Sequence, residues 1–239
     1  MLRLQTTHMR LSGKIILPCM APGMAPFIMQ ASESVISVCF NSSLLRYGGD
    51  IAVGAMTILT SVMQFAMLPM QGFAQGAQPI SSYNYGAKNP ERVKQTFWLL
   101  LRVSVIYAVI LWSLIMIFPG GFAAIFTNKP ELIAFTGKAL RIYCAAMVLM
   151  GVQIACQMTF ISLGNAGASI LVAVMRKFVL LIPLIYLLPR MMQEQTVAVY
   201  LAEPVADVLA VTFTAILFAF QFRKALKKIS VPLGPKASE

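Results

Sequence analysis

From Gln71 to Lys88 the chain reads QGFAQGAQPISSYNYGAK, a stretch that starts inside a long apolar segment and ends in a basic loop. It crosses two Gly-Ala pairs, one proline and a group of small polar residues. The segments on both sides are strongly apolar: of 239 residues 59% are hydrophobic and 11% are charged, and the mean hydropathy is +0.78. This composition is far from that of a soluble globular domain and predicts a membrane protein.

Six stretches are long and apolar enough to cross a bilayer as helices, which takes roughly 20 mostly apolar residues each. Few of them are polar on one face, as helices on the surface of a soluble protein would be. We therefore expect an all-α polytopic membrane protein with a single domain of six transmembrane helices. The expected spans are 24–45, 51–73, 95–118, 142–163, 168–188 and 199–221, with 222–239 as a tail.

Basic residues are distributed unequally over the loops, and an even number of spans puts both termini on one side. The side with the termini carries Arg3, Arg10, Lys14, Lys88, Arg92, Lys94, Arg223, Lys224, Lys227, Lys228 and Lys236, and we assign Arg176 and Lys177 to it because they come early in the fifth span. The opposite loops carry only Arg46, Lys129, Lys138, Arg141 and Arg190. Because Lys and Arg are retained in the cytoplasm, both termini are predicted to be cytoplasmic, in a bacterial plasma membrane.

Several function classes find no support in the sequence. The net charge of +11 is spread over short loops and a tail, which fits an anionic membrane surface better than nucleic acid. Cys19, Cys39, Cys144 and Cys156 form no CxxC pair, and His8 is the only histidine, so no metal site or Ser-His-Asp triad is indicated. There is no phosphate-binding loop of the G-x-x-x-x-G-K-[ST] type. We expect neither an enzyme nor a bound cofactor.

Glu33 is the only acidic residue in the middle of a predicted span. Gln30, Ser37 and Asn41 recur along one face of the same helix, and Glu33 borders it. An ionisable side chain is costly in hydrocarbon, so it tends to face protein or water. Glu33 is therefore predicted to couple to a cation; the alternative is a protonated glutamate that is only hydrogen-bonded.

Glutamines form a similar stripe on two other spans. Gln64 and Gln71 share a face of the second span, and Gln153 and Gln157 stand one turn apart in the fourth. A stripe of methionines runs beside the first pair, and such side chains adapt to varied apolar ligands. The stripes either line one internal cavity or make hydrogen bonds between helices, and the sequence leaves both possibilities open.

Two further acids, Glu203 and Asp207, lie near the outer end of the sixth span. We interpret them as a solvated helix start, where acidic residues suit the positive end of the helix dipole. The sequence also predicts a tight turn at Gly48-Gly49-Asp50, a helix start at Asn89-Pro90, and an amphipathic surface segment over 122–138.

The stretch quoted first, continued through Asn89–Lys94, resembles the link between the second and third helices of the C-terminal lobe in MATE multidrug exporters. PFIMQASESVISVCFNSSLLRYGGDIAVGAMTI, Pro26–Ile58, is similar to the MepA-like branch of that family. Weaker resemblance continues through GNAGAS, Gly164–Ser169, and RKFVLLIPLIYLLP, Arg176–Pro189. The resemblance covers most of the chain and only one of the family's two lobes.

The resemblance implies a secondary antiporter that expels organic cations and other amphipathic drugs in exchange for protons or sodium ions. It implies that Glu33 lies in the helix where several members hold a coupling acid, with Gln30 one turn earlier as the other candidate position. The fourth span, 142–163, contains no acid, which favours protons. The family's N-terminal lobe is absent from this sequence. The chain is then a truncated product, the partner of a separate N-terminal lobe, or half of a homodimer. A lipid-linked oligosaccharide flippase and a non-transporting membrane subunit are the alternative functions.

Overall fold

A computed structural model describes the backbone of residues 13–230 and the side chains of residues 31–230 except 166, 228 and 230. The chain divides into two compact units, Met1–Val38 and Cys39–Glu239, and each is described by itself. The described residues form helices and turns and no strand, so the predicted all-α class is confirmed.

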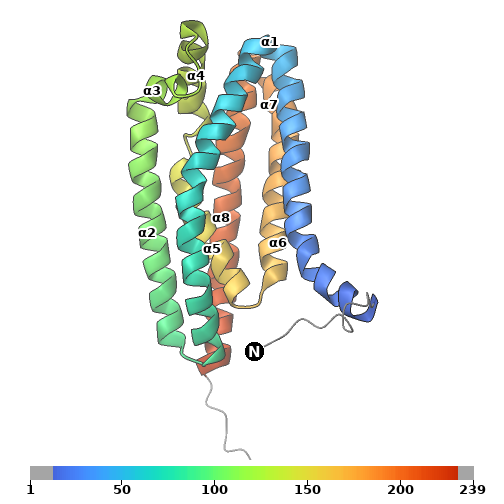
Figure 1. Cartoon of the computed structure of the whole chain (residues 1–239), viewed down its shortest axis with the longest axis vertical. Coiled ribbons are helices and arrows are strands. Elements are labelled where there is room, and N and C mark those ends of the chain that lie inside the picture. The colour runs from blue at the N-terminus through green and yellow to red at the C-terminus, as the bar shows by residue number, and fades with distance from the viewer. Residues whose placement is uncertain (1–12, 231–239) are drawn as a thin grey trace, which may run out of the picture. The chain divides into compact units, whose positions relative to one another are not determined.

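The first long helix, α1 (Gly13–Gly86), is interrupted at Gly49. Gly49 has φ 64° and ψ −163°, a backbone conformation open to glycine and costly for other residues. Figure 1 shows the chain reversing its direction at this point. The predicted turn at Gly48-Gly49-Asp50 is therefore confirmed, and the first two predicted spans, 24–45 and 51–73, lie on its two sides.

The second arm of α1 is longer than the span predicted for it. It continues beyond Phe73, through Pro79, and ends only at Gly86, so most of the stretch quoted at the outset is helical. The chain then turns through Lys88, at φ 55°. The Oδ1 of Asn89 accepts a hydrogen bond from the backbone N–H of Arg92 at 3.2 Å, and helix α2 (Pro90–Ile117) begins, as predicted.

The fourth predicted span, 142–163, is not one continuous helix. Helices α3 (Pro119–Ala124) and α4 (Pro130–Tyr143) are followed by a short 3-10 turn, η2 (Met147–Leu149), and by α5 (Met150–Ser162). The chain bends by 50° between α4 and the η2–α5 segment. The predicted span is therefore broken near its start, and the predicted 122–138 segment is divided between α3 and α4.

The fifth predicted span, 168–188, contains three helical segments in succession. These are α6 (Ala166–Val174), a π-helical segment η3 (Met175–Leu181) and α7 (Ile182–Met191). The last helix, α8 (Gln195–Ser230), contains the predicted span 199–221 and extends beyond it at both ends.

Four helices of the described chain are long and apolar enough to cross a membrane, with mean hydropathies of 1.8–2.3, and the bent α4–α5 pair gives a fifth if it is one broken span. This count takes α1 once, although it reverses direction at Gly49. Large apolar side chains such as Leu68, Ile106 and Phe220 are exposed, as expected where helices face lipid.

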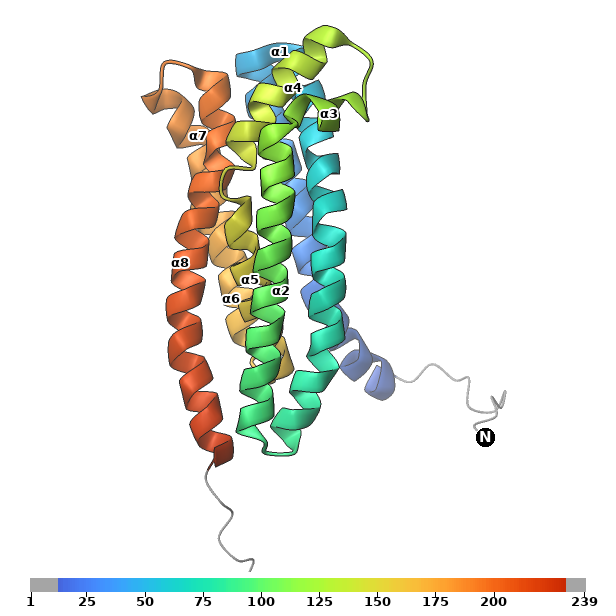
Figure 2. The same ribbon diagram turned by 90° about the vertical axis from the view of Figure 1, so that its left-hand side faces the viewer.

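Aromatic rings join three of the long helices. Phe218 of α8 stacks on Phe97 of α2 at 4.6 Å between centroids and meets Phe160 of α5 edge-on at 5.3 Å. Gly151 brings α5 close to α2, because a Cβ at this position would lie 2.9 Å from the backbone carbonyl of Ser104. Figure 2 shows α2, α5 and α8 running along the same direction.

Candidate functional site

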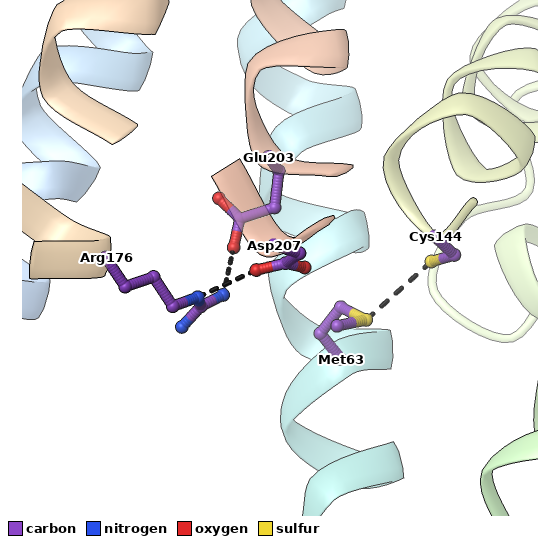
Figure 3. Close-up of polar contacts among 5 residues, drawn as sticks. All are labelled: Met63, Cys144, Arg176, Glu203 and Asp207. Carbon is purple, nitrogen blue, oxygen red and sulfur yellow. Dashed lines mark hydrogen bonds and ion pairs between the residues drawn. The ribbon is translucent and has the colours of Figure 1, made fainter. Parts of the chain in front are cut away.

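Three charged side chains meet between the fifth and sixth predicted spans. Arg176, in η3, donates from Nε to Oδ1 of Asp207 and from one terminal nitrogen to Oε1 of Glu203, each at 2.7 Å. Glu203 and Asp207 stand one turn apart on α8, so one planar guanidinium reaches both carboxylates (Figure 3). We refer to Arg176, Glu203 and Asp207 as the ion triad.

The ion triad is largely removed from solvent. Glu203 is 7% exposed and Asp207 2% exposed. Glu203 lies eight residues after Gln195, the first residue of α8, so it is about 12 Å along the helix from its start. The predicted solvated helix start is therefore wrong. In a low-dielectric interior two carboxylates are stable as ions only when a cation and hydrogen bonds compensate them, and Arg176 supplies both.

The same finding corrects the assignment of Arg176 and Lys177 to the cytoplasmic surface. Arg176 is bound to the acids of α8, and Lys177 is 7% exposed. A basic residue inside a span carries no weight in the loop count that predicts orientation. The remaining loop residues still favour the same side, and the cytoplasmic position of the termini stays a prediction.

The break between α4 and α5 lies close to the ion triad. Tyr143, at the end of α4, and Cys144, which follows it, are buried. The thiol of Cys144 contacts the sulfur of Met63 on α1 at 3.7 Å (Figure 3). Soft, polarisable side chains therefore pack on this side of the acids.

An apolar cleft of about 520 Å³ lies between the α4–α5 break and α8. Its lining residues are Ala145, Ala146, Val148, Leu149, Pro204, Val205, Val208 and Leu209. A smaller recess, of about 350 Å³, lies where α5 ends and includes Asn165, Gln221 and Lys224 among its lining residues. Among the described residues, no group of three or more His, Cys, Asp and Glu side chains is placed to hold a metal ion.

The predicted residues of the first span are distributed over the two units. Glu33 and Ser37 are exposed side chains of the unit Met1–Val38. Asn41 is half-buried in the other unit, and the side chain of Gln30 lies outside the described residues. The role predicted for these four residues stays a prediction.

The glutamine stripes differ from each other in exposure. Gln64 and Gln71 are exposed on the second arm of α1, whereas Gln153 is 5% exposed and Gln157 is half-buried on α5. The Oε1 of Gln153 is buried without a hydrogen-bond partner. Whether Gln64 and Gln71 line a cavity stays a prediction.

The ion triad was missed at the level of sequence, although a signal for it exists. Arg176 lies inside an apolar stretch, and Glu203 and Asp207 have the i, i+4 spacing in the next one. Because charges inside spans are costly, opposite charges in neighbouring spans are expected to pair. Considering each span alone hides this pairing.

Comparisons with known proteins match most of the chain. The MatE family model matches residues 26–187. The multidrug export protein MepA of Staphylococcus haemolyticus is 24% identical over 131 residues, which are 54% of this chain and 28% of the relative. MepA of Staphylococcus saprophyticus is 20% identical over 184 residues, which are 76% of this chain and 40% of the relative.

Solved structures show the same fold at low sequence identity. A multidrug resistance MATE family transporter of the MOP superfamily in an inward-facing conformation superposes with a TM-score of 0.85 at 19% identity, covering 93% of this chain and 51% of the transporter. An outward-facing conformation gives 0.81 at 18% identity, covering 94% and 50%. The chain thus spans about half of each solved transporter chain, and less than half of each MepA relative.

Proposed function

We propose that this chain, which belongs to the MatE family, is one lobe of a secondary antiporter that exports amphipathic or cationic drugs in exchange for protons or sodium ions. The observation that carries the proposal is the match of the family model over residues 26–187. The named relatives are multidrug export proteins. The apolar helices make the protein an integral membrane protein, and we propose a bacterial plasma membrane with both termini cytoplasmic.

In our proposal, transport requires a second lobe in addition to this one. Transporters built from repeated halves bind substrate between the halves. The second lobe is the N-terminal part of a longer protein of which this sequence is a piece, a separately made N-terminal lobe, or a second copy of the chain. The exposed stripe with Gln64 and Gln71 is then a wall of the cavity between the lobes.

Glu33 is the coupling residue in this proposal. The side chain of Glu33 is exposed in the middle of a predicted span. Exposure of an ionised carboxylate to lipid costs free energy, so this position suits a water-filled cavity. Ser37, one turn further along the same helix, is exposed as well and supplies a hydroxyl oxygen. The ion triad is less suited to this role, because its carboxylates already share a guanidinium.

The test is transport by the chain together with its second lobe in proteoliposomes. We expect Glu33→Gln to abolish dye efflux driven by an imposed proton or sodium gradient, while the amount of protein in the membrane is unchanged. Glu131→Gln is the matched control, because Glu131 is an exposed acid in the first turn of α4. Undiminished efflux by Glu33→Gln would exclude the coupling role.

The two alternative functions are weighed by the residues that line the pathway and by the same experiment. A flippase for lipid-linked oligosaccharides needs a basic lining for pyrophosphate, whereas the polar faces here hold Gln, Ser and Glu, and Arg176 is engaged by two acids. A non-transporting subunit would assemble with its partner and be indifferent to Glu33→Gln.

A further inference from the structure

The fifth predicted span contains one residue more than a regular α-helix would place between its two ends. From Ala168 and Ser169 onward its buried positions advance in steps of three or four residues, with a single step of five between Val172 and Lys177. The successive buried residues are Ala168, Ser169, Val172, Lys177, Leu181, Ile185 and Pro189. A stripe with a four-residue step stays near one face of an α-helix, so the five-residue step marks an inserted residue.

The backbone shows the same insertion. The N–H of Ile182 donates to the carbonyl of Lys177, five residues earlier, which is the hydrogen bond of a π-helix. Pro183 follows directly and has no N–H, so the carbonyl four residues before it lacks its α-helical donor. The local sequence therefore weakens the α-helical hydrogen bonds where the π-helical segment ends.

The inserted residue turns two consecutive basic side chains away from solvent. Arg176 stands four residues after Val172 and continues the stripe that comes from α6. Lys177 stands four residues before Leu181 and begins the stripe that continues into α7. In a regular α-helix neighbouring residues point about 100° apart, so these two side chains would not both continue the stripes of α6 and α7.

Isolated π-helical turns are rare, and an interaction has to compensate the distorted ladder of hydrogen bonds. Arg176 provides such an interaction, since it holds two carboxylates of α8 at 2.7 Å each and both acids are buried. We propose that the ion triad is a latch that fixes the π-helical register of η3, and that its release lets the segment return to a regular α-helix. The latch is a property of this lobe alone and goes beyond the transport function proposed above.

Release of the latch has a geometric consequence that can be measured. Removal of one inserted residue rotates α6 relative to α7 by about 100°. A side chain at the surface of a helix about 10–12 Å wide then moves by on the order of 8 Å. A probe on the exposed face of α6 reports this movement against a fixed point on α8.

The experiment measures the distance between spin labels at Ile170 on α6 and Ile216 on α8, which are 41% and 55% exposed. The full chain is used in lipid nanodiscs, with its native cysteines replaced by alanine. We expect one distance population with the ion triad intact. In Arg176→Met we expect a second population, in which the distance between the labels differs by up to about 8 Å.

Two further variants separate the latch from a general loss of folding. Asp207→Asn keeps the shape of the side chain and leaves the ion pair between Arg176 and Glu203 in place. We therefore expect a smaller share of the second population in Asp207→Asn than in Arg176→Met. Arg190→Met, at the exposed end of α7, removes a charge outside the ion triad and should leave the distance unchanged. If Arg176→Met does not yield folded protein, Asp207→Asn alone decides. An unchanged single population in the folded variants overturns the proposal whether or not the chain transports drugs.

Discussion

Removal of Arg176 alone should destabilise the lobe much more than removal of the whole ion triad. The side chains of Glu203 and Asp207 are 9% and 3% exposed, and that of Arg176 is 20% exposed, so the triad lies largely in a low-dielectric environment. Arg176→Met removes the guanidinium that holds two buried carboxylates. Breaking a buried pair in this way typically costs about 3–5 kcal/mol in the free energy of unfolding.

Replacement of all three residues has a different expected result. In Arg176→Met/Glu203→Leu/Asp207→Leu none of the three charges of the ion triad remains to be desolvated, and such apolar replacements are often neutral or stabilising by about 1–4 kcal/mol. We therefore expect the triple variant to recover most of the stability that the single variant loses. The comparison separates the cost of an uncompensated charge from the loss of a long side chain that packs between helices.

The assay is thermal unfolding of the purified chain in detergent, followed by the midpoint temperature. For a protein of about this size 1 kcal/mol corresponds to roughly 2–4 °C, so Arg176→Met should lower the midpoint by on the order of 10 °C. Arg190→Met is the control for loss of a positive charge. A triple variant as unstable as the single one would refute the electrostatic reasoning, and an unchanged midpoint in Arg176→Met would show that the acids do not need the guanidinium.

Two other substitutions test the packing and the helix start described above. Gly151→Ala should destabilise the chain by about 1–3 kcal/mol, because its Cβ would lie 2.9 Å from the Ser104 carbonyl. Gly72→Ala is the control and should not destabilise the chain, because a Cβ at this position would have nothing within 4 Å. Equal midpoint temperatures for the two variants would contradict the close approach of α5 to α2. Asn89→Ala should cost about 1 kcal/mol through loss of the cap on α2, measured as a lower midpoint, and Asn89→Ser should restore most of it.

Features that local chemistry decides could be predicted from the sequence. The turn at Gly49 follows from paired glycines between two apolar runs, and the start of α2 follows from a capping asparagine before a proline. The apolar composition predicts an all-α membrane fold, because only helices and closed barrels satisfy the backbone in lipid. These predictions hold because each depends on a few neighbouring residues.

Features that depend on packing between spans could not be predicted in the same way. Arg176 is 27 residues from Glu203 and 31 from Asp207, so each looks like an isolated charge within its own span. The break at 144–146 contains only Cys144, Ala145 and Ala146, none of which ends a helix by itself. The inserted residue in η3 becomes visible only when the burial of each position is known.

The turn at Gly49 also bears on the order in which the lobe is completed during synthesis. The hydroxyl of Thr196 donates to the carbonyl of Tyr47 at 3.0 Å, and that of Tyr200 donates to the carbonyl of Ala52 at 2.8 Å, across separations of 149 and 148 residues. The carbonyls of Tyr47 and Ala52 can therefore accept these hydrogen bonds only after the last helix has been made. A nascent chain that stops before α8 would leave both carbonyls without these donors.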